Sequence, residues 1–146
     1  MKNNREAISD DYIRGLVEGE GTFTFSTNIK ERRKTPTFAI KMHFRDEDLL
    51  KKVRDKLGLR NKVHIYNHQR HDGYIRAPQA MLIIREYDQL KDIIVPFFYK
   101  KLVGNKGKQF EEWLDKIWKD PDVPHKFKYI YKLHEWGYYD KNPKFD

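Results

Sequence analysis

Apolar residues recur at helical spacing over residues 12–19, directly after the polar residues Ser9, Asp10 and Asp11. These three are typical N-cap residues, because their side-chain oxygens can accept backbone N–H bonds at the start of a helix. We therefore expect the first element to be a helix that ends before the next strand. Residues 22–26, which read Thr-Phe-Thr-Phe-Ser, alternate between hydroxyl and phenyl side chains. This period of two predicts a half-buried strand.

A second strand and a second helix follow. Residues 28–36 form a charged connection, and residues 37–44 alternate again between two faces. One face would carry Phe38, Ile40, Met42 and Phe44, and the other Thr37, Ala39, Lys41 and His43. Asp46 can begin a helix whose apolar stripe runs over residues 49–57, and Gly58 is a typical residue just past a helix C-terminus.

The middle of the chain predicts a second pair of strands. Residues 62–66 and 74–84 are rich in β-branched and apolar residues, and the polar residues 67–73 would form the loop between them. Pro78 interrupts the second of these strands, because proline has no N–H to donate to a neighbouring strand.

The C-terminal half is helical. Residues 90–97 follow a helical period, and Pro96 is expected to kink or end that helix. Residues 110–118 mark a strong helix, residues 120–124 a turn and residues 127–134 a last short helix. The predicted order is α-β-β-α-β-β-α with further C-terminal helices, which places the chain in the α+β class.

Length and charge add a partner to this picture. With 146 residues we expect a single domain over residues 1–146. Lys and Arg number 30 against 22 Asp and Glu, so the formal net charge is +8 and a polyanion is the expected partner. Hydrophobic residues make up 38% and aromatic residues 14%, enough to build a core rather than a disordered basic tail.

The absence of cysteine removes several classes of function. The chain can form no disulfide framework, no thiolate zinc site and no cysteine nucleophile, and a reducing compartment fits best. Apolar runs are far shorter than the roughly 20 residues that span a bilayer, so we expect no membrane association. The polar N-terminus does not have the pattern of a secretory signal. We therefore expect a protein of the cytoplasm or of an organellar interior, not a secreted one.

The segment from Ile13 to Gly21 holds the most informative chemistry. Gly15 and Gly19 lie on one helix face, where another backbone could approach closely, and each costs about 1 kcal/mol of helix propensity. Glu18 and Glu20 stand at the helix C-terminus, where the macrodipole disfavours negative charge unless a cation is present. At about 100° per residue they point roughly 200° apart, so they would not bind one ion together. The alternative is that this segment is only a structural amphipathic helix with an acidic, glycine-rich end, which would have the same sequence pattern.

This segment resembles the motif of the LAGLIDADG homing endonucleases, with matches at Gly15, Leu16 and Gly21, an acid at both motif acids and a strand after it. The element order extends the resemblance over most of the chain. Residues 96–98, Pro-Phe-Phe, followed by residues 106–109, Lys-Gly-Lys-Gln, are similar to the family's helix-entry segment with its catalytic lysine. The resemblance implies a LAGLIDADG-like α+β domain whose antiparallel strands form a DNA-binding saddle.

The resemblance also implies roles for particular residues. Glu20 takes the place of the second motif acid, usually Asp, which binds a divalent metal at the scissile phosphate, and Gly19 is its neighbour in the metal site. Glu18 matches the first acid and is expected to play a supporting part. Lys106 would be the catalytic lysine, although a plain phosphate contact is the alternative. Mg²⁺ is the expected cofactor, and Ca²⁺ or Mn²⁺ could substitute for it in binding.

One motif in the chain implies a homodimer. The helix face expected to pack against its copy carries Ile13, Gly15, Leu16 and Gly19. A two-fold axis beside this face would bring two copies of Glu20 together, since one carboxylate is too few to hold the metal. The expected partner is double-stranded DNA with a long, nearly palindromic target.

The two strand pairs offer a surface for DNA, because a two-stranded ribbon fits the major groove. The candidate contacts on their polar faces are Thr24, Ser26, Asn28, Lys41, His64, Tyr66, Arg70 and Arg76. Lys30, Arg32, Arg33 and Lys34 form a basic segment between the first two strands. The length and charge of this segment favour contact with DNA, and a solvated loop is the alternative. Some of these side chains would contact only phosphate.

Two other groups of residues are set aside. His64, His68 and His71 lack carboxylate or thiolate neighbours in the sequence, so we expect polar contacts rather than a zinc site. The aromatic residues between Lys126 and Lys132 fit a helix core better than nucleic acid binding.

The expected function is that of a metal-dependent, site-specific DNA endonuclease. The alternative is a family member that has kept the fold and lost the cutting, and that acts as an intron RNA maturase or a DNA-binding regulator. A purely RNA-binding module would need exposed aromatic residues on the sheet for stacking, and the predicted strand faces are mainly polar.

Overall fold

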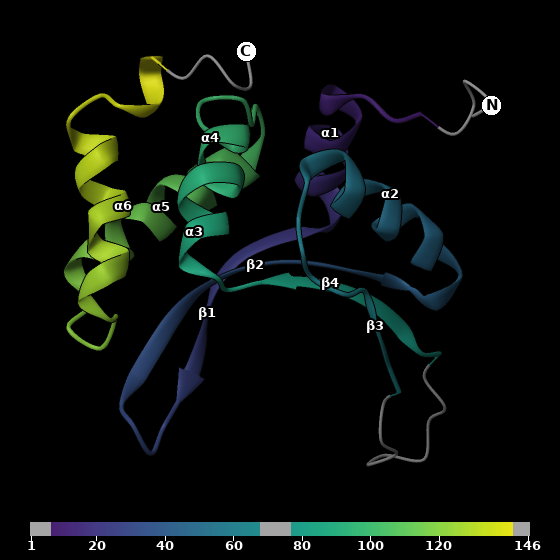
Figure 1. The fold of residues 1–146 in the computed structure, drawn as a ribbon, viewed down its shortest axis with the longest axis horizontal. Helices are drawn as coiled ribbons and strands as arrows, with labels where there is room; N and C mark the ends of the chain where they lie inside the picture. The colour runs from purple at the N-terminus through teal and green to yellow at the C-terminus, as the bar shows by residue number, and fades with distance from the viewer. Residues whose placement is uncertain (1–6, 68–76, 142–146) are drawn as a thin grey trace. The chain divides into compact units, whose positions relative to one another are not determined.

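The structure is a computed structural model that describes residues 7–67 and 77–141 (Figure 1). The chain forms two compact units, the first from Met1–Gly21 and Ala39–Ile83, the second from Thr22–Phe38 and Ile84–Asp146. A single domain over residues 1–146 stays a prediction. No helix in the described parts of the chain combines the length and the apolar character needed to cross a bilayer.

Four strands form one sheet in the order β1-β2-β4-β3. The strands are β1 Gly21–Asn28, β2 Arg33–His43, β3 His64–Tyr66 and β4 Gln79–Ile84. Helices precede, separate and follow the strands, so the α+β class and the α-β-β-α-β-β-α order predicted from the sequence are confirmed.

The two helices of the first unit begin and end where the local sequence predicts. Helix α1, Asp10–Glu20, starts at Ser9, whose hydroxyl accepts the Tyr12 N–H at 3.0 Å. A short 3-10 turn precedes helix α2, Glu47–Leu57. Gly58 ends α2 in the left-handed conformation (φ 75°), where its N–H reaches the carbonyls of the last turn.

Strands β3 and β4 pair antiparallel, with His64 opposite Met81. β4 alternates between half-buried and buried residues, and Ala80 and Leu82 are fully buried. The strand begins directly after Pro78, later than the predicted start at residue 74. Residues 68–76, which include most of the predicted loop, lie outside the described part of the chain.

Strand β2 differs from its prediction in two ways. It begins at Arg33, so the connection predicted over residues 28–36 is shorter. Thr37 and Ala39 are only 3% and 4% exposed, although the alternation assigned them to the polar face. Thr37 tolerates burial because its hydroxyl donates to the Thr35 carbonyl at 2.9 Å. Phe44, predicted on the apolar face, is instead 45% exposed in the 3-10 turn after the strand.

The helix around Pro96 continues past the proline. Helix α3, Tyr87–Gln89, passes through a π-helical segment, Leu90–Ile94, into helix α4, Val95–Phe98. In the π pattern the N–H after Ile94 bonds to the Leu90 carbonyl, so the next acceptor in line is the Lys91 carbonyl. Proline cannot donate there, and the buried Tyr139 hydroxyl donates to that carbonyl instead, at 3.1 Å. The helix therefore does not end at Pro96.

The core of the second unit is aromatic. Helix α5, Asn105–Lys119, packs against helix α6, His125–Glu135, and a final 3-10 turn spans Tyr139–Lys141 (Figure 1). Phe23 lies at the centre of a cluster, with ring centroids at 5.0–5.7 Å from those of its four aromatic neighbours. Those neighbours are Phe38, Phe98, Phe110 and Trp113. Trp118, near the end of α5, is 39% exposed and stacks on Tyr131.

Candidate functional site

Helix α1 ends in a group of oxygen atoms. The N–H of Gly21 bonds to the Val17 carbonyl as the C-cap, and a helix leaves the carbonyls of its last turn, here including that of Gly19, without intrahelical partners. The Glu20 side chain is exposed and the Glu18 side chain is half-buried. The last turn, which is described in full, contains no basic residue. Negative charge therefore accumulates at the end of this helix.

The glycine face of α1 is open. Gly15 and Gly19 are exposed, and a Cβ atom added to either would meet nothing within 4 Å. Leu16 beside them is half-buried. Ile13, also expected on the dimer face, is 0% exposed and lies in the core of its own chain, beneath the open face. This surface has the shape that close packing of two helices requires.

The oxygen atoms at the end of α1 fit a hard divalent cation. The Glu20 carboxylate and the Gly19 carbonyl are the kind of ligand that Mg²⁺ prefers. Within the described ranges, no three His, Asp or Glu side chains gather into a group that could hold a metal.

Lys106 lies in the first turn of α5, in the second unit, and is half-buried. The glycine after it explains the path of the chain. A Cβ atom on Gly107 would lie 2.8 Å from the Leu102 carbonyl oxygen, so only glycine lets this turn approach the preceding segment. The Gly107 N–H donates to the Gly104 carbonyl at 3.0 Å and fixes the turn that carries the lysine.

The hairpin of β1 and β2 carries several of the predicted DNA contacts. Thr24, Asn28, Lys30 and Arg32 are all exposed. The turn is ordered by two bonds: the Glu31 N–H donates to Asn28 Oδ1 at 3.2 Å, and the Arg32 N–H donates to the carbonyl of residue 29 at 3.3 Å. These bonds fix the backbone of the turn that carries the basic side chains.

Arg33, at the start of β2, is also exposed and forms an ion pair with Glu31, Nη2 to Oε2 2.8 Å. Both side chains are about half exposed, 50% and 56%, so this pair is weak in water.

Ser26, predicted as a DNA contact, is part of an internal chain of hydrogen bonds. Arg85 Nε donates to the Ser26 hydroxyl at 2.7 Å, and this hydroxyl lies 2.8 Å from the Thr37 hydroxyl. Because Thr37 donates onward to the Thr35 carbonyl, Ser26 is the donor to Thr37. The exposed Arg85 was missed from the sequence, and its position directly after the last strand was the available signal.

The remaining predicted contacts belong to the first unit. Lys41 on β2 and His64 and Tyr66 on β3 are exposed. Tyr66 is an aromatic residue exposed on a strand face that the sequence predicted to be mainly polar. The other candidates, Arg70 and Arg76, lie outside the described residues, as do His68 and His71.

Three comparisons with known proteins agree. The family model of the LAGLIDADG endonuclease matches residues 13–117. The crystal structure of the homing endonuclease I-TnaI is 25% identical, covers 90% of this chain and 76% of its own, and has a TM-score of 0.57. The LAGLIDADG homing endonuclease I-GzeII, solved in complex with its DNA target, shares the fold at 24% identity, with a TM-score of 0.59 over 92% of this chain and 44% of its own.

A probable intron-encoded DNA endonuclease 1 from Mycosarcoma maydis is 38% identical over 56 residues. That match spans 38% of this chain and 21% of the relative, so the chain covers about a fifth of the length of this curated protein. The family model covers well over half of the chain and includes the α1 motif, the sheet and α5. The chain therefore belongs to the LAGLIDADG endonuclease family.

Proposed function

We propose that this protein is a site-specific endonuclease that hydrolyses both strands of a DNA duplex. The observation that carries the proposal is the exposed Glu20 carboxylate at the end of a glycine-faced helix, inside the family's motif. Its charge opposes the macrodipole of its own helix, which fits a position that a bound cation compensates. The formal net charge of +8 suits a polyanionic substrate.

The active form in this proposal is a homodimer that packs through α1. The open face at Gly15 and Gly19 supports it, because a partner helix can approach there without steric conflict. Leu16 would add apolar contact at the edge of the same face. The symmetry of such a dimer suits a long, nearly palindromic target.

Glu20 and the Gly19 carbonyl would hold Mg²⁺, and the ion, when bound, supplies Lewis-acid stabilisation of charge on the phosphodiester oxygens. Ca²⁺ or Mn²⁺ would substitute in binding. Lys106 would act as a cation toward the phosphate, since an ammonium group stabilises the charge that develops there during hydrolysis. Glu18 would support the site without direct contact with the metal.

The DNA contacts in this proposal lie on the polar faces of the two strand pairs, in the major groove. Lys30, Arg32 and Arg33 would bind phosphates near the tip of the first hairpin. The contacts nearer the base edges would be Thr24, Asn28, Lys41, His64, Tyr66, Arg70 and Arg76. Ser26 would act through Arg85, because its own hydroxyl is committed to Thr37. The protein would work in the cytoplasm or in an organellar interior.

A randomised duplex library, incubated with the protein with and without Mg²⁺, tests this function. We expect cleaved molecules to share one long, nearly palindromic sequence and to appear only with the metal. Sequence-specific binding without cleavage would identify a DNA-binding regulator instead. Binding to intron RNA with no preference among DNA duplexes would identify a maturase.

A further inference from the structure

The β1–β2 hairpin is held along one side by α5. The Phe23 N–H donates to Gln109 Oε1 at 3.3 Å, and Trp113 Nε1–H donates to the Thr24 carbonyl at 2.8 Å. Gln109 and Trp113 lie one helical turn apart on the same face of α5. Both bonds fix the first strand of the hairpin near its base.

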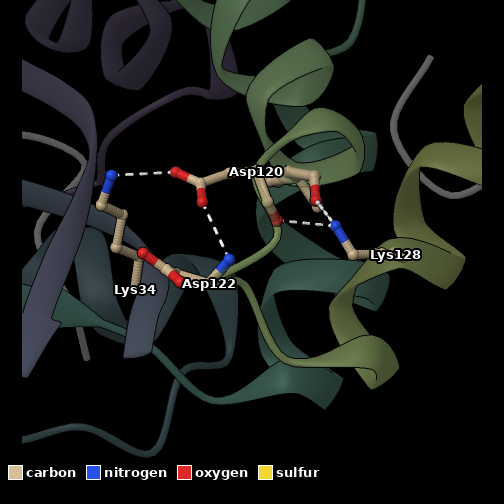
Figure 2. A network of polar contacts seen from close by, with 5 residues as sticks. Lys34, Asp120, Asp122 and Lys128 are labelled. Atoms are coloured by element: carbon tan, nitrogen blue, oxygen red, sulfur yellow. Dashed lines mark hydrogen bonds and ion pairs between the residues drawn. The ribbon is translucent and has the colours of Figure 1, made fainter. Parts of the chain in front are cut away.

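The second strand is fixed from beyond the end of α5. Lys34 Nζ forms an ion pair with Asp120 Oδ2 at 3.0 Å, and the Lys34 N–H donates to the Asp122 carbonyl at 3.0 Å. The Asp122 N–H donates in turn to Asp120 Oδ1 at 2.9 Å (Figure 2). One lysine is thus bound at both its backbone and its side chain to the turn between α5 and α6.

That turn is itself fixed by hydrogen bonds from a half-buried lysine. Lys128 Nζ, on α6, donates to three carbonyls at the end of α5, those of Ile117 at 3.0 Å, Trp118 at 2.7 Å and Asp120 at 2.8 Å. Val123 in the turn is 3% exposed, so the turn is packed as well as hydrogen-bonded. The turn that holds Lys34, the anchor of the hairpin, is therefore itself held by hydrogen bonds and packing within the second unit.

The pKa values of Lys34 and Asp120 are shifted in the directions that favour the charged forms of both side chains. The Asp122 N–H and then the Lys34 ammonium hold the pKa of Asp120 below its usual value. The hydrogen bond to Asp120 raises the pKa of Lys34. The Asp120 side chain is 23% exposed, against 56% for Glu31 in the pair with Arg33 at the hairpin tip. Lys34 is thus the basic residue of this hairpin that is most firmly engaged within the protein.

We propose that Asp120 is a positioning residue for DNA recognition: it holds Lys34 and thereby sets the direction in which the hairpin presents Asn28, Lys30 and Arg32. Lys34, although it belongs to the basic segment, does not contact DNA. The inference rests on the proposed function, because it assigns the hairpin to DNA. It adds a residue 86 positions away from Lys34 in the sequence to the determinants of specificity.

Two variants test the pair from either side, and one serves as a matched control. Asp120→Asn keeps an oxygen for the Asp122 N–H and places an amide where the ammonium of Lys34 had a carboxylate. Lys34→Met removes the charge and keeps the length of the side chain. Glu31→Gln breaks the exposed pair with Arg33 on the same hairpin and leaves the anchor intact.

The first measurement uses the protein without DNA. Residual dipolar couplings of the backbone amides of the hairpin and of α5 report whether the two keep one fixed orientation. We expect one common orientation in the wild type and in Glu31→Gln, and reduced hairpin couplings in Asp120→Asn and Lys34→Met. Unchanged hairpin couplings in both anchor variants would overturn the inference.

The second measurement uses DNA, as base preference among randomised duplexes and as the dependence of affinity on salt. We expect both anchor variants to lose about tenfold in discrimination at the base pairs nearest the hairpin tip, and their double variant to lose no more than either alone. Lys34→Met should keep the wild-type salt slope. A slope reduced by about one would identify Lys34 as a phosphate contact and overturn the inference.

The two experiments separate this inference from the proposed function. A wild type that prefers no DNA sequence would refute the proposed function, and the recognition role of Asp120 with it. A wild type with a clear preference that both anchor variants retain in full would overturn the role of Asp120 alone.

Discussion

Helices α1 and α5 end in opposite ways. The last turn of α5 carries Lys116 and Lys119, and Lys128 adds an ammonium group that binds three of its carbonyls. The last turn of α1 carries two glutamates and no cation, and Glu20 is exposed. Positive charge at a helix C-terminus is typically worth 0.3–1 kcal/mol, roughly, and negative charge there costs a similar amount.

At the C-terminus of α5 the chain itself supplies cations and hydrogen-bond donors for the helix carbonyls. In the last turn of α1, which is described in full, it supplies no cation. The end of α5 has its charges and carbonyls satisfied within one unit, and it serves as the anchor for the β1–β2 hairpin. The end of α1 gains no stability from Glu20. This contrast supports the proposal that Glu20 is used for binding a cation, and the following predictions test each side of it.

The largest expected effect is on catalysis. Glu20→Gln keeps the size of the side chain and removes its charge, so cleavage should fall by about 10³-fold or more, roughly 4 kcal/mol at the transition state. The free energy of unfolding should stay the same or rise by a few tenths of a kcal/mol, roughly, because repulsion from the macrodipole is relieved. Single-turnover cleavage of a saturated duplex in Mg²⁺ and urea denaturation measure the two quantities.

Glu18→Gln is the matched control for this experiment. The Glu18 side chain points to a different side of the helix from Glu20, so it should not contact the metal directly and the loss of cleavage rate should be smaller. Near-normal cutting by Glu20→Gln would show that this carboxylate is not a metal ligand, and greater damage from Glu18→Gln would exchange the roles of the two acids.

The other side of the comparison predicts an effect on stability. Lys128→Met removes the donor to three carbonyls at the end of α5, so the free energy of unfolding should fall by about 2 kcal/mol. Lys126→Met, an exposed lysine of the same helix, should change it by less than about 0.5 kcal/mol. Urea denaturation followed by circular dichroism gives both values. Equal effects of the two substitutions would contradict the claim that the three hydrogen bonds of Lys128 stabilise the end of α5.

The glycines near the end of α1 should separate assembly from folding. Gly19→Leu adds a side chain to open space, so the single chain should fold normally while dimer affinity falls by about tenfold or more. Gly21→Ala should instead destabilise the chain by about 1–3 kcal/mol, since its Cβ would lie 2.5 Å from Val17 Cγ1 and 2.9 Å from the Val17 carbonyl oxygen. Sedimentation and urea denaturation distinguish the two results. A wild type that is monomeric while it cuts both strands would rule out the dimer.

A smaller effect is expected from the hairpin tip. Lys30→Gln removes an exposed cation, so the slope of log affinity against log salt should become shallower by about one, with the base preference unchanged. Lys41→Gln should instead alter preference at particular base pairs. If Lys30→Gln leaves the salt slope unchanged and Lys41→Gln leaves the base preference unchanged, the DNA lies on another face of the protein.

The smallest effect concerns pH. Because the pKa of Asp120 is held below its usual value, its contribution is present above the ordinary pKa of a carboxyl group and is lost as pH falls through the lowered value. The difference in the free energy of unfolding between the wild type and Asp120→Asn should therefore shrink in acid. Urea denaturation of both proteins from neutral pH into the acid range measures it, and a difference that does not depend on pH would contradict a charged pair.

The sequence alone determined the elements whose signals are local. Ser9 caps α1 as expected, and Gly58 ends α2 in the left-handed conformation. The period of two at the start of β1 predicted a half-buried strand, and Phe23 is buried while Thr22 and Thr24 beside it are exposed. In each case a few neighbouring residues carry the whole physical cause, either a hydrogen bond within one turn or the pleat of one strand.

The chemistry of the candidate site was also readable in part. The resemblance of residues 13–21 to the family motif implied a role for Glu20, and the family model includes that segment. The role of Glu20 as a metal ligand and that of Lys106 in catalysis stay predictions. The openness of the glycine face, in contrast, depends on what the rest of the chain leaves uncovered, and only the structure supplies it.

The tertiary structure decided everything that depends on partners far along the chain. The helix continues beyond Pro96, which has no N–H for the Lys91 carbonyl, and the Tyr139 hydroxyl donates a hydrogen bond to that carbonyl instead. Ser26 accepts a hydrogen bond from Arg85, and Lys34 forms an ion pair with Asp120. A pattern along the sequence cannot express such pairings, because which groups meet is settled only when the chain packs and each buried or half-buried polar group must find a partner.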